Sequence, residues 1–394
     1  MASTLPKIIL KKGKEKPLLR GHPWVFSGAV ARIEGEVSPG DVGEIYSKEG
    51  QYLGVGHLNP ASQIILRVLT QKKEPIDIAF LGERISRAAR WRETFLKGRT
   101  NAYRIINGEG DFLPGLIVDR YGETLVLQSL TAGIERLKGV LVDLLVSEMK
   151  PRTIYERSDV ATRSQEGLPE VTGLLYGKEV SDRVEIEEHG CHFQVDVKGG
   201  QKTGFYLDQR ENRCDLKHVS QGTRVLDCFS NTGAFSIYAG LGGAEEVTLI
   251  DSSEEALKRA EEHFHLNALG QIPHRFIRGD AFEVLRSLKP EYDIVILDPP
   301  PFAKRKGNLS GASRGYKDLN LQALRLSKKG GFLLTFCCSH HVSWDLFQKI
   351  IFSAAIDGGR GVQLLSRKGH PVDHPINLFH PEGEYLKGFL CKVL

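Results

Sequence analysis

Two residues with clear chemical potential, an aspartate and a cysteine, each close an apolar run of this sequence. Asp298 ends the run from Ile294 and is followed by prolines, and Cys338 ends the run from Phe332 about 40 residues later. A short β-branched run that closes on a carboxylate is typical of a buried parallel strand, which carries the carboxylate to the sheet edge where α/β folds bind ligands. Aspartate followed by two prolines at this place marks methyltransferases that act on nitrogen or carbon atoms of planar groups. With a thiol at the end of a second strand, the pattern predicts covalent chemistry on a nucleobase.

Three more aspartates, Asp227, Asp251 and Asp280, end three earlier runs. After Asp227 the chain turns into a helix at Gly233, whose lack of a side chain lets a ligand approach the backbone. One glycine does not make the G-x-G-x-x-G fingerprint, so this loop does not suit a pyrophosphate. Asp251 ends the second strand, where doubly wound folds grip ribose hydroxyls, and Asp280 could accept a hydrogen bond from an adenine amino group.

Adenosine held by carboxylates without phosphates describes S-adenosylmethionine (SAM). A single strand-terminal aspartate is more often a helix N-cap than a ligand-binding group. The recurrence of these acids at regular strand–helix spacing favours a cofactor site over a series of caps. The residues predicted to contact the cofactor at these strand ends are Asp227, Phe229, Asn231, Thr232, Gly233, Asp251, Ser252, Asp280 and Ala281.

Residues 189–394 alternate between β-rich runs and amphipathic helical runs. Strands at this spacing require right-handed crossovers and a doubly wound sheet. A polar loop is expected from the prolines to about Asp318, followed by a helix over Leu319–Leu326. The predicted strands are Arg224–Cys228, Val247–Asp251, His274–Arg278, Ile294–Asp298, Gly331–Cys338, Val362–Ser366 and Tyr385–Leu394.

Two segments precede this α/β region. Residues 1–72 contain short alternating runs separated by Gly and Pro signals, which predicts a small all-β barrel. Residues 75–180 contain two amphipathic helical runs, Ile78–Phe95 and Ile134–Met149, together with several strands, which predicts a compact α+β domain. The Gly- and Pro-bearing stretch Glu166–Glu179 is expected to be a linker into the third domain.

A length of 394 residues suits two or three domains, and an apolar share of 41% is enough for real cores. With 53 basic and 49 acidic residues the net charge is only +4, so the overall charge does not indicate a nucleic-acid-binding protein. No apolar run approaches the ~20 residues that span a bilayer. Six cysteines without a C-x-x-C pair argue against a disulfide framework or a zinc site. We expect a cytoplasmic protein with neither a metal nor a membrane partner.

The chain resembles, over nearly its full length, the family of bacterial 23S rRNA cytosine-5 methyltransferases that carry an N-terminal PUA domain. The matching segments are Arg20–Ser27, Gly108–Gly122, Gly200–Arg213, Val225–Gly233 and Leu297–Lys304. The resemblance implies an α/β fold: a Rossmann-like class I methyltransferase domain with a mostly parallel seven-stranded sheet, preceded by a small β-barrel PUA domain and a central α+β domain. It also places the third segment beside the cofactor. The residues of that segment expected to contact the methionine end or to order the site are Gln201, Lys202, Tyr206 and Arg210.

The resemblance further implies roles for Asp298 and Cys338. Cytosine C5 is a poor nucleophile, and a thiolate that adds to C6 turns the ring into an enamine, which can attack a sulfonium methyl group. Cys338 matches the nucleophile, and Asp298 matches the group that protonates or hydrogen-bonds N3. Many RNA cytosine-5 methyltransferases carry a second cysteine just after the Asp-Pro pair, where this chain has prolines. Cys337 should point to the opposite face from Cys338, and the candidate acceptors of the C5 proton are Cys337, His340, His341, water and Asp298.

A base inside a helix is out of reach, so the target must be unpaired or flipped out. Phe302, just after the prolines, is expected to stack on the target base. The basic residues expected to hold phosphates on the following loop are Lys304, Arg305, Lys306 and Arg314.

The N-terminal barrel resembles a PUA domain, a module that binds structured RNA. Within it, Arg20 and Trp24 combine a cation with an aromatic ring and are predicted to contact RNA. The expected partner is RNA, either 23S rRNA or a large-subunit assembly intermediate, and the resemblance implies a homodimer.

Two other functions stay open. Relatives with the same strand-end motif and no nucleophile methylate a ring nitrogen of rRNA guanine, and Cys338 separates that activity from the first because nitrogen transfer needs no thiolate. The chain is alternatively an RNA-binding or ribosome-assembly protein with a vestigial methyltransferase domain, although intact acids at the strand ends argue against decay.

Overall fold

The chain divides into two compact units in the computed structural model, which describes residues 5–303 and 306–394. Lys304 and Arg305, both predicted to hold phosphates, lie outside the described residues. Within the described part, every helix is too short or too polar to cross a membrane. Unit 1 consists of Met1–Ile186, Val195–Leu207 and Val372–Gly383, and unit 2 consists of Glu187–Gln194, Asp208–Pro371 and Glu384–Leu394.

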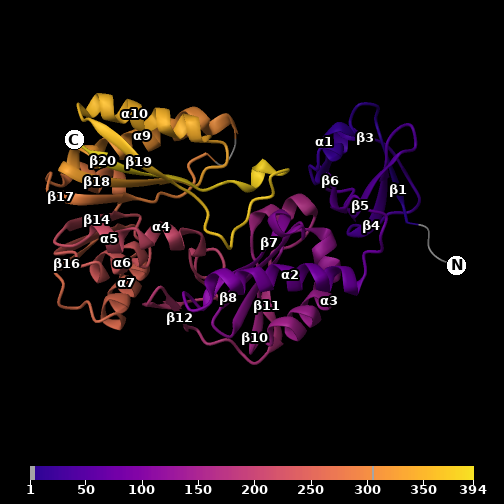
Figure 1. Ribbon diagram of the computed structural model, residues 1–394, viewed down its shortest axis with the longest axis horizontal. Coiled ribbons are helices and arrows are strands. Elements are labelled where there is room, and N and C mark those ends of the chain that lie inside the picture. Colours follow the sequence, from indigo (N-terminus) through magenta and orange to yellow (C-terminus); the bar gives the residue numbers. More distant parts are fainter. Residues whose placement is uncertain (1–4, 304–305) are drawn as a thin grey trace. The chain divides into compact units, whose positions relative to one another are not determined.

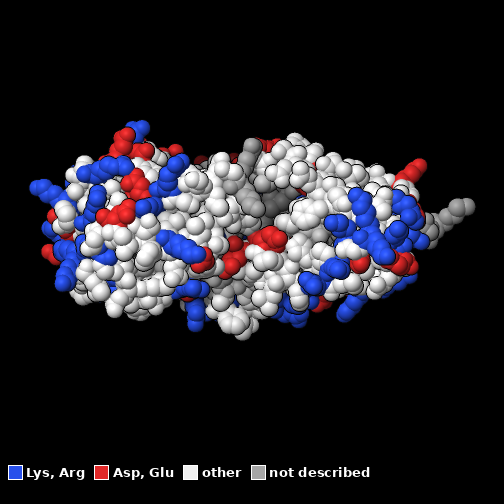
Figure 2. Space-filling model, turned by 90° about the horizontal axis from the view of Figure 1, so that it is seen from above, with Lys and Arg blue, Asp and Glu red and all other residues white. Residues whose placement is uncertain are grey.

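The N-terminal β domain of unit 1 is a six-stranded sheet with the order β2-β6-β5-β4-β1-β3. Alternate side chains of these strands meet in an apolar core that includes Ile8, Val25, Ile45 and Leu66. Figure 2 shows Lys and Arg side chains gathered on this domain, at the right of the view. Its elements are β1 (Lys7–Leu10), α1 (Lys16–Leu19), β2 (Trp24–Phe26), β3 (Val30–Glu34), β4 (Asp41–Tyr46), β5 (Tyr52–Leu58) and β6 (Ile64–Thr70).

The central part of unit 1 is a five-stranded sheet, with the order β11-β10-β9-β8-β7, that packs against helices α2 (Ile78–Leu96) and α3 (Ala132–Met149) (Figure 1). Both helices lie close to the predicted ranges because apolar residues recur along them every three or four positions. The strands are β7 (Ala102–Asn107), β8 (Leu116–Tyr121), β9 (Thr124–Ser129), β10 (Thr153–Ser158) and β11 (Val171–Gly177).

The predicted linker Glu166–Glu179 is wrong over half of its length, because β11 occupies Val171–Gly177 and pairs antiparallel with β10. β11 is an edge strand whose Leu174 and Tyr176 are exposed. An edge strand interrupted by Gly173 buries little apolar surface, so its alternation is weak in the sequence. A hairpin of β12 (Val184–Glu188) and β13 (Cys191–Val195) follows β11.

Unit 2 is built on a seven-stranded sheet with the order β16-β15-β14-β17-β18-β20-β19. The pairs between neighbours from β16 to β18 are parallel, and β20 is antiparallel to both β18 and β19. The prediction of a doubly wound, mostly parallel sheet is confirmed. The strands are β14 (Arg224–Cys228), β15 (Glu246–Asp251), β16 (His274–Arg278), β17 (Tyr292–Leu297), β18 (Ser327–Cys337), β19 (Val362–Lys368) and β20 (Lys387–Val393).

Helices cover both faces of this sheet, and Figure 1 shows α9 and α10 on one face and α6 and α7 on the other. β14, β15 and β17 are buried almost throughout, as a parallel sheet between two helical layers requires. The helices are α4 (Arg210–Cys214), α5 (Leu216–Val219), α6 (Ala234–Leu241), α7 (Glu254–Leu266), α8 (Ala281–Ser287), α9 (Leu309–Leu326) and α10 (Trp344–Gly358).

The predicted polar loop to about Asp318 is wrong in its second half, because α9 begins at Leu309. Ala312, Tyr316 and Leu319 on its inner face are buried in the core of unit 2. Glycines and serines between these positions lower the helix propensity and hide the three-to-four spacing. Tertiary packing therefore decides the start of this helix.

Candidate functional site

Asp227, near the end of β14, is a buried carboxylate at the C-terminal edge of the sheet. Its Oδ2 accepts a hydrogen bond from Ser236 Oγ at 2.7 Å, and its Oδ1 has no hydrogen-bond partner among the described residues. Burial, with the charges of Asp298 and Asp251 adding to it, raises the pKa of Asp227 to about 7. An unsatisfied buried oxygen is costly, so this position favours a ligand that carries a positive charge or a donor.

The backbone after β14 is shaped for close approach. Phe229, Asn231 and Gly233 all have positive φ angles, of 61°, 48° and 75°. A Cβ on Gly233 would lie 2.9 Å from Ala260 Cβ and 3.1 Å from Leu249 Cδ2. Glycine therefore allows α6 to begin directly against α7 and β15, and it holds the turn in a left-handed conformation that other residues rarely adopt.

Asp251 binds both the turn after β14 and the turn after its own strand β15, and Asp280 binds the start of the helix that follows it. Asp251 accepts from Asn231 N at 2.8 Å and from Ser253 N at 2.9 Å, one bond to each oxygen. Asp280 caps α8, and its Oδ1 accepts from Phe282 N at 2.8 Å. A carboxylate oxygen can accept two hydrogen bonds, so both side chains keep lone pairs for a ligand. Capping and ligand binding are compatible at these positions.

The other predicted cofactor residues lie on the same three turns. Thr232 is half-buried, and its carbonyl oxygen accepts from His263 Nδ1 at 2.9 Å. Ser252 is exposed beside Asp251, and Ala281 is buried as the first residue of α8. Together these strand ends offer acceptors for hydroxyl and amino groups and a buried carboxylate for a cation, which fits the donor set of SAM.

Asp298, directly after β17, is held by a chain of side-chain amides. Gln209 Nε2 donates to Asp298 Oδ1 at 3.1 Å, and Asn212 Nδ2 donates to Gln209 Oε1 at 2.7 Å and to the carbonyl oxygen of Gly369 at 3.1 Å. Gln209 and Asn212 are buried, whereas Asp298 is half-buried. Sequence reasoning selected other residues of the same polar segment and missed Gln209. The density of polar residues there was the available signal, but the partner lies 89 positions away.

The adjacent cysteines at the end of β18 have different surroundings. Cys337 is fully buried in the apolar core, and burial raises the pKa of its thiol. Cys338 is half-buried, and its Sγ donates to the carbonyl oxygen of Pro299 at 3.4 Å. Pro299 directly follows Asp298. The predicted nucleophile thus contacts the residue that follows the predicted carboxylate, at the ends of two neighbouring strands.

Phe302 packs inward, with its ring centroid 4.7 Å from that of Tyr316 and 5.8 Å from that of Phe282. This packing accounts for the side chain without a bound base, and stacking on a target base stays a prediction. Arg314 lies on α9, not on a loop, and is exposed. With Lys317 it lines an open cavity of about 720 Å³ between α9 and α10.

The first half of the polar segment Gly200–Arg213 is anchored to β8 within unit 1. Thr203 Oγ1 donates to Asp119 Oδ2 at 2.6 Å, so the 2.8 Å contact between Tyr121 and Thr203 has the tyrosine hydroxyl as donor. Arg104 Nε donates to the other oxygen of Asp119 at 2.8 Å. Two of the segments on which the family resemblance was based are therefore bound to each other by buried side chains.

Three predicted cofactor contacts of this segment are divided between the units. Gln201 and Tyr206 belong to unit 1, and Arg210 belongs to unit 2. Tyr206 has Lys202 Nζ 4.8 Å from its ring centroid, and Gln201 is exposed. Arg210 is buried, and its Nε donates to Glu211 Oε1 at 3.2 Å. Contacts of these residues with the cofactor stay predictions.

The two predicted RNA contacts of the N-terminal β domain differ in exposure. Trp24 is half-buried; its Nε1 donates to Glu109 Oε1 at 2.8 Å, and its ring centroid lies 4.4 Å from that of His380. Arg20 is exposed. Trp24 therefore has partners inside unit 1, whereas Arg20 reaches solvent.

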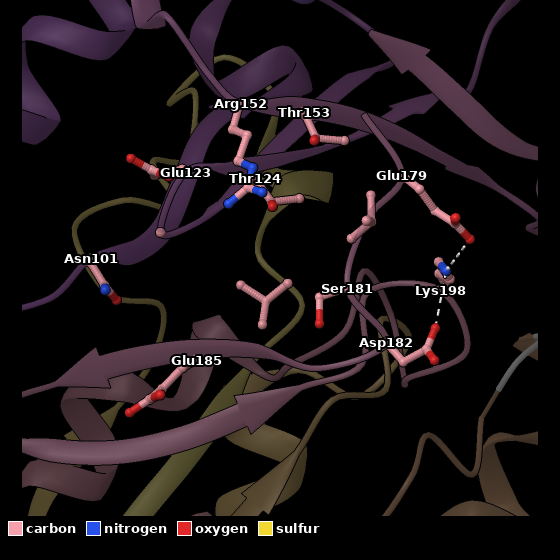
Figure 3. A pocket seen from close by; sticks show the side chains of 13 residues that line it. Asn101, Glu123, Thr124, Arg152, Thr153, Glu179, Ser181, Asp182, Glu185 and Lys198 are labelled. Atoms are coloured by element: carbon pink, nitrogen blue, oxygen red, sulfur yellow. Dashed lines mark hydrogen bonds and ion pairs between the residues drawn. The ribbon is translucent and has the colours of Figure 1, made fainter. Parts of the chain in front are cut away.

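A second cavity, of about 760 Å³, lies in unit 1 where β8 turns into β9 (Figure 3). Lys198 forms ion pairs there with Glu179 at 3.5 Å and Asp182 at 3.0 Å. Acidic side chains outnumber basic ones on its wall, which does not suit RNA phosphates. Across the described ranges, no group of three or more His, Cys, Asp or Glu side chains could hold a metal ion. The charged residues of the wall are Glu123, Arg152, Glu179, Asp182, Glu185 and Lys198.

Two family models match the chain. One, described as a PUA-like domain, matches residues 8–71, and the other, described as an S-adenosylmethionine-dependent methyltransferase, matches residues 168–351. Among curated proteins, the ribosomal RNA large subunit methyltransferase I of Salmonella arizonae is 46% identical over 99% of this chain and 98% of its own length. The protein of the same name from Escherichia coli O139:H28 is also 46% identical, over 98% of this chain and 99% of its own length.

Solved structures agree over the full length of the chain. A protein described as a SAM-dependent methyltransferase from Streptococcus mutans is 25% identical with a TM-score of 0.83, and it covers 99% of this chain and 100% of its own. A methyltransferase structure in complex with SAH (S-adenosylhomocysteine) is 26% identical with a TM-score of 0.85 over the same shares.

Proposed function

Because this chain belongs to the ribosomal RNA large subunit methyltransferase I family, and is therefore a SAM-dependent methyltransferase, we propose that it methylates C5 of a cytosine in 23S rRNA. The observation that carries the proposal is the position of Cys338, whose thiol donates to the carbonyl oxygen of Pro299 beside Asp298. Transfer to a ring nitrogen needs no thiolate, whereas C5 needs a nucleophile at C6. A thiol next to the strand-end carboxylate is what carbon methylation requires.

In the proposed reaction, Cys338 attacks as a thiolate. The Sγ–C6 bond forms as the C5–C6 π pair moves to C4–C5 and the C4–N3 pair moves to N3, which takes the proton of Asp298. When bound, SAM would supply the electrophilic methyl group for C5, and its sulfur would keep the electron pair of the broken S–CH₃ bond, which gives neutral S-adenosylhomocysteine. A base then takes the C5 proton, the C5–C6 double bond re-forms, the thiolate leaves, and N3 returns its proton to Asp298.

The acceptor of the C5 proton is a separate question from the nucleophile. Cys337 lies in the apolar core, which speaks against it. His340 and His341 are exposed just beyond β18. Water would also balance the step, and the ionised Asp298 would balance it if N3 loses its proton to water instead of returning it to Asp298. The candidates are therefore the two histidines, water and Asp298.

For the cofactor, we propose that Asp251 binds the ribose hydroxyls and that Asp280 accepts from the adenine amino group. The lone pairs that both carboxylates keep beyond their turn contacts support this assignment. The buried Oδ1 of Asp227 supports a role near the cationic methionine end. Gln201, Tyr206 and Arg210 keep their predicted roles at that end.

For the RNA, we propose contacts with the exposed cations Arg20 and Arg314. A ribosomal substrate is consistent with action in the cytoplasm, and a homodimer is kept as part of the proposal. The PUA-like match over residues 8–71 supports RNA binding by the N-terminal β domain.

Nucleoside mass spectrometry of 23S rRNA from cells with and without the gene tests the proposal. Loss of one 5-methylcytidine, restored by the wild-type gene, is the expected result. Unchanged 5-methylcytidine with a missing methylguanosine would replace carbon methylation by nitrogen methylation and return Cys338 to a structural role. No change in any nucleoside of 23S rRNA would direct the search to other RNAs first, and then to a binding or assembly protein.

A further inference from the structure

The amide chain at Asp298 joins three segments that are far apart in the sequence. Gln209 precedes α4, Asn212 lies within α4, Asp298 follows β17, and Gly369 follows β19. All four belong to unit 2. Gln209 and Asn212 are 2% and 3% exposed, so their hydrogen bonds do not compete with bulk water.

The direction of each hydrogen bond in this series of side-chain amides follows from one backbone carbonyl group. The oxygen of Gly369 can only accept, so the atom of Asn212 that faces it must be Nδ2. The same Nδ2 faces Gln209, whose facing atom must then be Oε1. Gln209 therefore turns Nε2 toward Asp298 and donates to Oδ1. The amide orientations, which are usually ambiguous, are fixed here by the network.

We infer that Gln209 is a positioning residue for Asp298, which fixes the carboxyl group by donating to Oδ1. The inference rests on the proposed function, because it concerns the proton that Asp298 gives to cytosine N3. Asn212 acts through Gln209, because its hydrogen bond to Oε1 fixes the orientation of the Gln209 amide.

A donor on Oδ1 does more than orient the group. When Asp298 gives up its proton, negative charge develops on the carboxylate, and a hydrogen bond to a charged acceptor is stronger than one to a neutral acceptor. Gln209 therefore stabilises the charged carboxylate more than the protonated acid that precedes it. An interaction that strengthens along the reaction accelerates the chemical step and leaves substrate binding unchanged.

The test compares Gln209→Leu with the wild-type protein in SAM-dependent methylation of 23S rRNA. We expect kcat to fall roughly 10–100-fold, with the KM for RNA and the Kd for SAM unchanged. The rate at which Cys338 is trapped by RNA containing 5-fluorocytidine should fall by the same factor, because proton delivery to N3 accompanies the attack on C6. A purely structural role would not single out this step.

Two further variants make the result interpretable. Gln128→Leu is a matched control. Gln128 is also buried, and its Nε2 donates to the carbonyl oxygen of Arg157 at 2.8 Å within unit 1. The kcat of this variant should stay at the wild-type value. Gln209→Glu keeps the shape and the acceptor for Asn212 but replaces the amide donor, so it should also lose kcat, and it serves if the leucine variant does not fold.

The possible outcomes distinguish failure of the positioning role of Gln209 from failure of the proposed function. Wild-type kcat and wild-type trapping in both Gln209 variants would overturn the positioning role and leave the proposed function standing. A fall in kcat matched by equal losses in SAM affinity and melting temperature would also overturn it. Absence of 5-methylcytidine with the wild-type protein would defeat the proposed function itself.

Discussion

The two halves of the sheet edge hold their functional groups in different ways. At the ends of β14, β15 and β16, the groups that bind Asp227, Asp251 and Asp280 lie 2 to 20 positions away, on the strand–helix turns or at the start of a helix. At the ends of β17 and β18, Asp298 and Cys338 are bound by residues 89 and 39 positions away. The first half is a local structure repeated three times, and the second is assembled by the fold.

This difference matches the chemistry proposed for each half. Cofactor binding needs acceptors at roughly the right place, which a turn supplies together with its own capping bonds. Bond formation needs the thiol and the acid in fixed mutual geometry, and displacement by about 1 Å can cost on the order of 100-fold in rate. Changes in the second half should therefore act on kcat, and changes in the first half on affinity and stability.

The largest effect is expected for Cys338→Ala. Loss of the nucleophile should lower kcat on the order of 10⁴-fold or more and leave SAM binding intact. Cys337→Ala is the matched control, since it removes a neighbouring thiol from the core and should lower stability while keeping turnover. Methylation assays with calorimetric titration of SAM measure both. Substantial turnover without Cys338 would remove covalent catalysis from the account.

Asp298→Asn should lower kcat by about 10²–10⁴-fold, the usual range for loss of an acid–base group, with little change in SAM affinity. Asp293→Asn is a suitable control on the same strand, because Asp293 accepts from Arg224 N and Lys328 Nζ and has no proposed role. Steady-state kinetics of both variants decide the point. Equal activities would show that Asp298 does not take part in proton transfer.

Asp251→Ala should weaken SAM binding by about 10–100-fold, because hydrogen bonds to a charged group contribute about 1.5–3 kcal/mol. kcat at saturating SAM should change much less. Asp280→Ala should lose mainly the cap of α8, at about 1 kcal/mol of stability, and a smaller part of the affinity. An unchanged dissociation constant for the Asp251 variant would remove it from the ribose site.

The last prediction concerns the pH dependence of stability at Asp227, with no effect on turnover proposed. Its pKa, raised from 3.8 to about 7 by burial, means that the folded state retains a proton that the unfolded state loses. The free energy of unfolding should therefore decrease as the pH rises from about 4 to about 7, by at most about 4 kcal/mol. Asp227→Asn cannot ionise and should flatten this decline in denaturant titrations. A decline of the same size in the variant would place its origin elsewhere.

The parts of the molecule that the sequence predicted are those set by local spacing. β14 and β16 have the predicted bounds, and the strand-end acids lie on one sheet edge because a parallel sheet aligns the C-terminal ends of its strands. The parts missed depend on tertiary contacts. α9 begins at Leu309 because its apolar face packs on the sheet, and β11 pairs at an edge despite a weak pattern.

The same distinction applies to individual side chains. Cys338 was selected from the family resemblance, and strand alternation predicted that Cys337 points to the opposite face. The half-buried and fully buried positions of the two thiols follow that alternation. Gln209 could not be selected, because the sequence around it does not indicate that its partner is Asp298, directly after β17. Phe302 and Trp24 are aromatic, as residues that stack on RNA bases are. In the structure, however, Phe302 packs against Tyr316 and Trp24 donates a hydrogen bond to Glu109, each within its own unit.

The central claim is that Cys338 forms a bond with C6 of a cytosine, and trapping tests it most directly. The wild-type protein is incubated with SAM and a 23S transcript that contains 5-fluorocytidine, whose fluorine blocks the final elimination. The account predicts a SAM-dependent adduct that survives denaturation and maps to Cys338 by peptide mass spectrometry. Formation of 5-methylcytidine on unmodified RNA under the same conditions, with no adduct on the fluorinated RNA or with an adduct at Cys337, would contradict it.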